Sequence, residues 1–143
     1  MIDPVIARLK ATAMPPLRLI EGMAELASLA GKQPRAMPAA YVVPLDERAE
    51  PAATTLRVRQ RVTVTFGVIV IARNVSDLGR GGASLADLAP VREAVRAALL
   101  GWGEGDGVTD SPITFAGGQV LDADAGLVAW QDSFTTALYY QQS

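Results

Sequence analysis

The clearest pattern in the chain is an alternation of apolar and other residues across positions 56–74. Even positions from Val58 to Val70 are apolar apart from Gln60, whereas the odd positions begin with arginine and threonine. Alternation of period two over this length predicts a β-strand. At about 3.3 Å per residue the strand would span roughly 55 Å, more than the roughly 30–40 Å width of a domain of this size. We therefore expect it to bend at Gly67, or to protrude and have its edge covered by a partner.

A first helix is predicted at the N-terminal end of the sequence. Asp3 can cap it, and Pro4 would take the first helical position, where a missing N–H costs nothing. The helix must end before Pro15, because the residue before a proline disfavours helical geometry.

A second, longer helix is predicted after position 84. Its apolar stripe has helical spacing and consists of Leu85, Leu88, Val91, Val95, Ala98 and Leu99. Ser84 and Asp87 resemble a capping box at its start. Pro90 is awkward inside a helix, so the helix either begins near Pro90 or kinks there, and Gly101 ends it.

The other segments complete an α+β plan in one domain, residues 1–143. We expect a brief strand at 17–20, a short helix at 23–30, a strand at 39–45, an exposed loop at 46–55, and a terminal hairpin of strands 113–121 and 127–140. The predicted fold is an antiparallel or mixed sheet of about four to five strands, with the two main helices packed on one face.

The composition of the chain argues against several classes of function. Half of the 143 residues are hydrophobic and the net charge is −2, with neither Cys nor His. The chain therefore lacks disulfides, thiolate metal sites and the commonest general base, and we expect no enzyme activity and no cofactor. The net charge argues against a nucleic-acid-binding module. The longest apolar run, 66–72, is far shorter than the roughly 20 residues of a membrane span.

Glycines and acidic residues in the loops do not form a convincing ligand site. The glycines at 101–107 follow a helix and precede a strand, the reverse of a phosphate-binding loop. The carboxylates nearby and in the final turn are more typical of solvated turns than of a calcium loop.

A row of arginines on the long strand is the best candidate for function. Three like charges on one strand face are unlikely core residues, and two readings stay open. The arginines either hold local carboxylates on a solvated face, or meet acidic residues of another subunit. The candidate interface residues are Arg57, Arg59, Arg61, Arg73 and Arg80, with Asp46, Glu47 and Glu50 as acidic partners.

Several stretches occur in an order that matches a known family. They are Ala39 to Leu45, Gln60 to Val68, Leu99-Leu100-Gly101-Trp102, and Gly126 to Thr135 with its Ala129-Trp130-Gln131-Asp132 core. In this order and spacing the chain resembles the tail terminator (tail completion) proteins of long-tailed phages, in the branch of Mu-like siphophages and prophages.

The resemblance implies a structural virion protein at the head-proximal end of the phage tail. Such proteins form a ring, usually hexameric, that stops polymerisation of the tail tube and joins the head. The implied partners are other copies of the chain, the major tail tube protein and the head–tail connector proteins, with DNA only passing through the ring. Another neck component, such as a head-closure or connector adaptor, is the alternative; a nucleic-acid-binding module is a more distant one.

Overall fold

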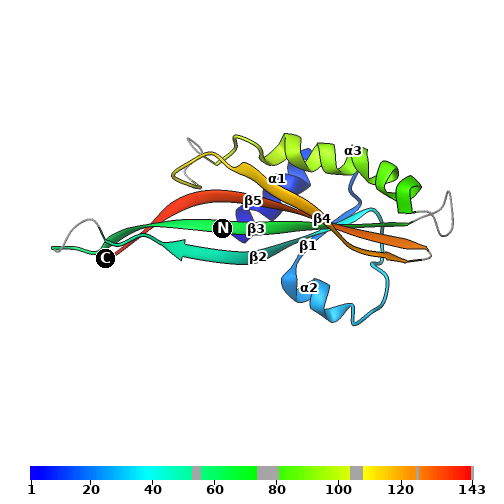
Figure 1. Ribbon diagram of the computed structural model, residues 1–143, viewed down its shortest axis with the longest axis horizontal. Coiled ribbons are helices and arrows are strands. Elements are labelled where there is room, and N and C mark those ends of the chain that lie inside the picture. Colours follow the sequence, from blue (N-terminus) through cyan, green and yellow to red (C-terminus); the bar gives the residue numbers. More distant parts are fainter. Residues whose placement is uncertain (53–55, 74–80, 104–107, 125, 143) are drawn as a thin grey trace.

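The computed structural model describes residues 1–52, 56–73, 81–103, 108–124 and 126–142, with the backbone alone at 81–87 and 124. The elements are α1 (Ile2–Thr12), β1 (Leu19–Gly22), α2 (Met23–Ser28), β2 (Ala39–Ala49), β3 (Arg59–Arg73), α3 (Gly81–Leu99), β4 (Thr114–Asp124) and β5 (Leu127–Gln141). The five strands form one sheet in the order β1-β2-β3-β5-β4 (Figure 1). The pairing of β1 with β2 is parallel and the other pairings are antiparallel, so the predicted α+β fold with a mixed sheet is confirmed.

The sheet is covered on both faces, but unequally. On one side, α1 and α3 pack over the centre of the sheet, and we call this the main-helix face; its core includes Val5, Leu9, Phe66, Val68, Val95, Leu99 and Phe134. On the other side, the short α2 covers a smaller cluster around Tyr41 and Ile69, and we call this the α2 face. The two main helices therefore share one face as predicted, while α2 packs on the opposite one (Figure 1).

The first helix begins earlier than its sequence suggested. Met1 is the N-cap and makes no side-chain capping bond, so the prediction that Asp3 caps the helix is wrong. Asp3 lies in the first turn instead, where its negative charge still favours the positive end of the helix dipole. Arg8 of α1 donates from Nε to the carbonyl oxygen of Ala98 at 3.0 Å, which ties α1 to the last turn of α3.

The long helix α3 runs through Pro90 rather than starting there. It begins at Gly81, so Ser84 lies within it and is not its cap. Pro90 removes one helical N–H, and it is exposed, on the side of the helix away from the sheet. The buried positions Leu88, Val91, Val95, Ala98 and Leu99 follow the stripe that the sequence predicted.

The segment after Leu45 is strand rather than exposed loop. β2 continues to Ala49, because β3 is long enough to supply backbone partners, from Asp46 opposite Thr65 to Ala49 opposite Val62. A register shift at Leu45, between Pro44 and Asp46, separates this part from the body.

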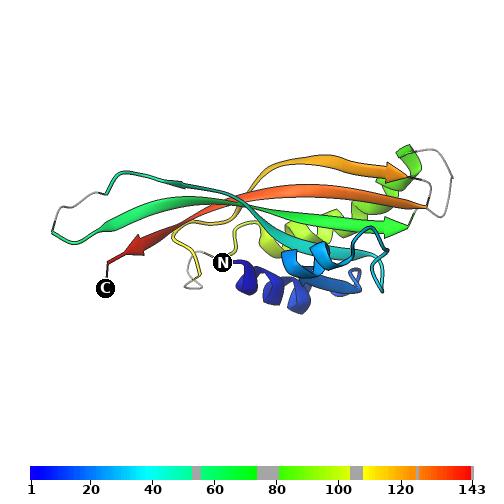
Figure 2. The ribbon, with the colours of Figure 1, turned by 90° about the horizontal axis from the view of Figure 1, so that it is seen from below.

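The long strand was expected either to bend at Gly67 or to protrude, and it protrudes. The outer ends of β2, β3 and β5 project together beyond the helices (Figures 1 and 2). We call this projection the arm and define it as residues 46–50, 56–64 and 136–142. The edges of β3 are covered from within the same chain, by β2 on one side and β5 on the other.

A buried ion pair fixes α3 to the sheet. Asp132 of β5 is fully buried and accepts two hydrogen bonds from Arg92 of α3, 3.0 Å from Nε and 2.8 Å from Nη2. Trp130 donates its indole N–H to the same carboxylate at 2.8 Å, and the Arg92 guanidinium lies 4.3 Å from the centre of the Trp130 ring. A Cβ on Gly118 of β4 would lie 2.6 Å from Asp132 Oδ1, so only glycine allows this close approach.

Candidate functional site

The arm presents different residues on its two faces, because side chains alternate along each strand. Arg59 and Arg61 lie on the α2 face with Tyr139, which is paired with Arg61. Gln60 and Tyr140 lie on the main-helix face. Helix α2 covers only the body, so the arginine row is left at the surface of the arm, as its position in the alternation predicted.

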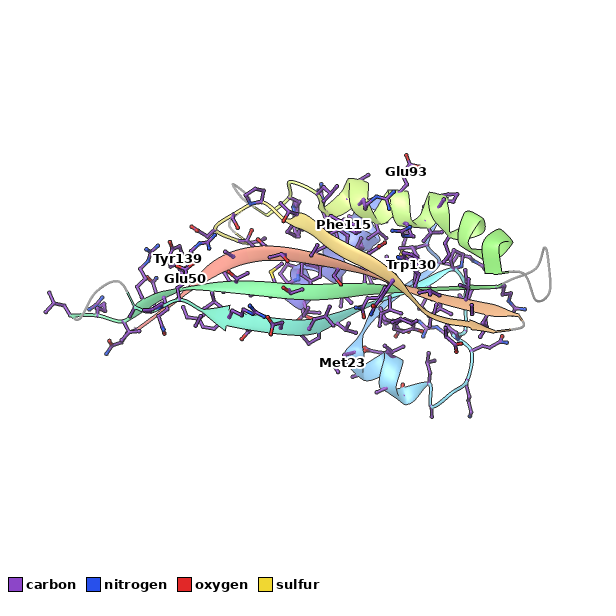
Figure 3. All side chains as sticks on the ribbon, in the orientation of Figure 1. Met23, Glu50, Glu93, Phe115, Trp130 and Tyr139 are labelled. Carbon is purple, nitrogen blue, oxygen red and sulfur yellow. The ribbon has the colours of Figure 1, made fainter. Side chains whose placement is uncertain are left out.

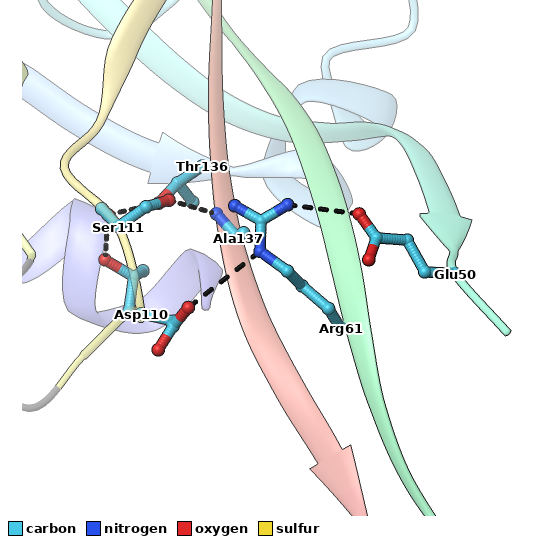
Figure 4. A network of polar contacts seen from close by, with 7 residues as sticks. Glu50, Arg61, Asp110, Ser111, Thr136 and Ala137 are labelled. Atoms are coloured by element: carbon cyan, nitrogen blue, oxygen red, sulfur yellow. Dashed lines mark hydrogen bonds and ion pairs between the residues drawn. The ribbon is translucent and has the colours of Figure 1, made fainter. Parts of the chain in front are cut away.

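Arg61 is held by carboxylates of its own chain. Its Nη1 lies 3.3 Å from Glu50 Oε1, and its Nε lies 3.9 Å from Asp110 Oδ2 (Figure 4). All three side chains are partly exposed, so each pair contributes little stability in water. For Arg61 the structure favours the first of the two sequence readings, an arginine that holds local carboxylates.

The segment that carries Asp110 is anchored on β5. The Asp110 N–H donates to the carbonyl of Ala137 at 2.7 Å, and the Ala137 N–H donates to Ser111 Oγ at 3.0 Å. Thr136 Oγ1 donates to the Ser111 carbonyl at 2.7 Å (Figure 4). Residues 110–111 thereby cover the edge of β5 beyond the end of β4.

Arg57 and Arg59 differ from Arg61. The Arg59 guanidinium lies 3.7 Å from the centre of the Tyr139 ring, a cation–π contact that leaves the charge unneutralised. Within the described part of the chain neither Arg57 nor Arg59 forms an ion pair with a carboxylate. These two cations therefore remain able to bind an acidic partner.

The acidic residues that we expected on a neighbouring subunit also lie on the arm of the same chain: Asp46 and Glu47 in β2, and Glu50 just beyond it (Glu50 is labelled in Figure 3). Asp46 pairs with Arg48 at 3.2 Å, and Glu47 accepts a 2.8 Å hydrogen bond from the Tyr140 hydroxyl. This hydrogen bond is the main reason that the pKa of Tyr140 is raised, with desolvation and the charge of Glu47 adding to it. Contacts of these acids with another subunit stay a prediction.

The candidate residues do not form a single cluster. Arg73 ends β3, at the end of the sheet opposite the arm, and its side chain is exposed. Arg80 lies outside the described residues. Arg73 is thus separated from the row at 57–61.

The sequence predicted a strand at 113–121, which is β4, but did not identify it as an exposed edge of the sheet. Three of its large apolar side chains are exposed: Phe115, Val120 and Leu121 are 42%, 48% and 46% accessible. No residue from Thr114 to Leu121 is charged or proline, although charges and prolines are common on free edges. This run without charge or proline, next to a strand of alternating pattern, was the sequence signal that could have indicated an unprotected edge strand.

A hollow beside Arg61 is one candidate chemical site among the described residues. This shallow hollow of about 360 Å³ is lined mainly by hydroxyl side chains, and its one charged group, Arg61, is already ion-paired. Within the described ranges, no group of three or more acidic residues could hold a metal ion. None of the helices in these ranges combines the length and apolarity that crossing a membrane requires.

Comparison with known proteins identifies the family of the chain. The family model described as phage tail terminator protein matches residues 2–142 of the 143. A comparison with curated proteins gives no match. The family match does not distinguish the Mu-like branch, which stays a prediction. The chain belongs to the phage tail terminator protein family and is a structural component of a phage tail.

Proposed function

We propose that the protein caps the head-proximal end of the tail tube as a hexameric ring, stops tube polymerisation there and presents the surface that joins the head. Membership of the tail terminator family supports the tail role. The hexamer and the head-joining surface follow from the resemblance set out above.

The observation that carries the ring is the arm. It extends a three-stranded sheet beyond the helices (Figure 2), and near its tip Tyr140 is 50% and Val58 46% exposed. Val62 and Val64 at the base of the arm are buried within the chain, so the uncovered part of this projection is its tip around Val58 and Tyr140. Contact with a neighbouring copy would cover it, and head-to-tail contacts of this kind close a ring when the rotation between copies closes.

The mass of the purified protein tests the ring. Six copies of the 15.0 kDa chain give about 90 kDa for a closed ring. Light scattering over a range of concentrations, with and without added tail tubes, should show this mass or tubes carrying a ring at one end. A protein that stays monomeric in solution and leaves tube ends bare would contradict the ring.

Loss of the gene tests the capping role separately. Without a terminator, tubes should grow beyond their normal length, as seen by electron microscopy of lysates. Tails of normal length beside unattached heads would instead identify a head-closure or connector adaptor. The partners implied are the major tail tube protein on one side of the ring and connector proteins on the other, with DNA passing through.

A further inference from the structure

The sheet has unequal edges, and β4 is the least protected. On the β1 side, the short β1 pairs with only the first residues of β2. The rest of that edge carries Pro44, the register shift at Leu45 and the charged Asp46, features that discourage pairing. β4 contains two register shifts, yet it has no proline, and no charge before Asp122.

The exposed apolar residues of β4 and its first charged residue lie on opposite faces of the sheet. Phe115 is paired with Phe134 and Val120 with Trp130, whose side chains belong to or pack against the main-helix core. Phe115 also makes an edge contact with Phe134, with ring centres 5.7 Å apart. Asp122 is paired with Ala129, which is opposite Ile71 on the α2 face. β4 thus presents apolar groups on one face and a carboxylate on the other.

The tip of the arm likewise has an aromatic residue on the main-helix face and a charged residue on the α2 face. Tyr140 is exposed on the main-helix face, and Arg59 is exposed on the α2 face. Arg57 and Val58 directly precede β3 and are also exposed, and the alternation in the sequence assigns Val58 to the face of Gln60 and Arg57 to the face of Arg59.

The arm and β4 extend toward opposite ends of the long axis of the molecule (Figures 1 and 2). Tyr140 at one end and Phe115 and Val120 at the other are thus exposed on the main-helix face. On the α2 face, Asp46 and Glu50 of the arm are paired with arginines of the same chain, whereas Arg59 and Asp122, which have opposite signs, have no ion-pair partner among the described residues.

A ring relates these two ends directly. Rotation about the ring axis keeps the inner face of every subunit inward. Where the sheet edge of one copy meets the arm of the next, like faces then lie on the same side. This pairing puts the exposed apolar side chains of the two ends against each other and Arg59 beside Asp122. Within the described residues, neither Arg59 nor Asp122 has an ion-pair partner.

We propose that the arm of one copy docks along β4 of the next, with Arg57 and Arg59 facing Asp122, and Val58 and Tyr140 against Phe115 and Val120. The inference rests on the ring of the proposed function and names the surfaces that build it. Exposed charges contribute more to the choice and orientation of partners than to affinity, while the apolar groups supply the buried area.

Engineered cysteines test the contact, because the chain has no native cysteine. The variant carrying both Val58→Cys and Val120→Cys should give a ladder of covalent species ending at six chains when treated with a short bifunctional maleimide. Each single variant should give no ladder. The matched control joins Val58→Cys with Glu93→Cys, since Glu93 is exposed on α3, away from the sheet (Figure 3), and it should remain uncrosslinked.

Charge exchange tests the pairing of Arg57 and Arg59 with Asp122. Asp122→Arg should reduce the ring fraction at least tenfold at equal protein concentration, and adding Arg57→Asp with Arg59→Asp should restore it. Glu93→Arg should leave the ring intact, and circular dichroism should show every variant folded.

The outcomes separate the two proposals. A wild-type ring that survives Asp122→Arg, with no ladder from the double-cysteine variant, overturns the docking contact and leaves the ring standing. Covalent dimers from Val120→Cys alone would show β4 pairing with β4, and would also overturn it. A wild-type protein that forms no ring, in solution or on tubes, overturns both.

Discussion

The body and the arm are parts of the same sheet, yet they are stabilised differently. Val68, in the body part of β3, is fully buried, whereas Val58, at an equivalent position in the alternation, is 46% exposed at the arm. In the body, helices cover the sheet on both faces; on the arm, the strands have only each other and a short loop segment. The same alternation thus produces buried residues as far out as Val62 and an exposed surface at the tip of the arm, where Val58 and Tyr140 have apolar surface that a neighbour can bury.

The largest expected effect is at the centre of the body. Phe134→Ala removes a fully buried ring that stacks on Phe66 and meets the edge of Phe115. The lost burial and the cavity should lower the free energy of unfolding by about 3–5 kcal/mol. Denaturant titration at fixed protein concentration measures it, with Tyr140→Ala on the arm as control. If Phe134→Ala and Tyr140→Ala lowered the free energy of unfolding equally, the body and the arm would not differ in how much burial stabilises them.

The next effect concerns the joint between α3 and the sheet. Asp132→Ala leaves Arg92 without its carboxylate in a mostly buried site. We expect a loss of about 2–3 kcal/mol, less than the cost of a fully buried unpaired charge, since Arg92 retains some solvent access. Thermal unfolding followed by circular dichroism measures the loss. If Asp132→Ala were as stable as the wild type, the ion pair would not hold α3 on the sheet.

A smaller loss of stability is expected when the glycine beside that ion pair is replaced. Gly118→Ala places a methyl group 2.6 Å from Asp132 Oδ1 and 2.9 Å from Trp130 Nε1. Crowding in a packed site should cost about 1–3 kcal/mol. Gly22→Ala is the matched control, because the nearest atom to its methyl would be 3.5 Å away. Urea unfolding of both variants measures the cost. Equal losses in the free energy of unfolding would contradict the prediction that a methyl group at Gly118 is crowded.

The smallest effect is a titration on the arm. The pKa of Tyr140 is raised above 10.0, first by its hydrogen bond to Glu47. The folded state therefore favours the protonated phenol. The resulting stability is complete below the unfolded pKa and is lost as the pH rises through the folded one. Ultraviolet titration, comparing wild type with Tyr140→Phe, should place Tyr140 above pH 10, and Glu47→Gln should lower that value.

The sequence predicted those features that depend on local pattern. Periodicity identified the long strand, the stripe of α3 and the final hairpin, because each has a long uniform pattern. It failed at residues 46–49, which become strand only because β3 lies beside them. The capping role of Asp3 and the start of α3 also failed, since helix ends depend on one or two residues.

The candidate site was predicted in part. The exposed arginine row followed from alternation, but the intrachain pairing of Arg61 with Glu50 depends on two strands meeting. The exposure of β4 depends on its place at the edge of the sheet, which follows from strand order. Both properties belong to the assembled sheet, and the only trace of either in the sequence is the run without charge or proline at 114–121.

The order of strands also has a consequence for synthesis on the ribosome. β5 is last in the chain, yet it lies between β3 and β4 in the sheet. Until its final residues emerge, one side of β3 and the inner side of β4 have no partner, and the arm lacks its third strand. The arm, and any contact that the proposed ring makes through it, therefore cannot form before β5 has left the ribosome.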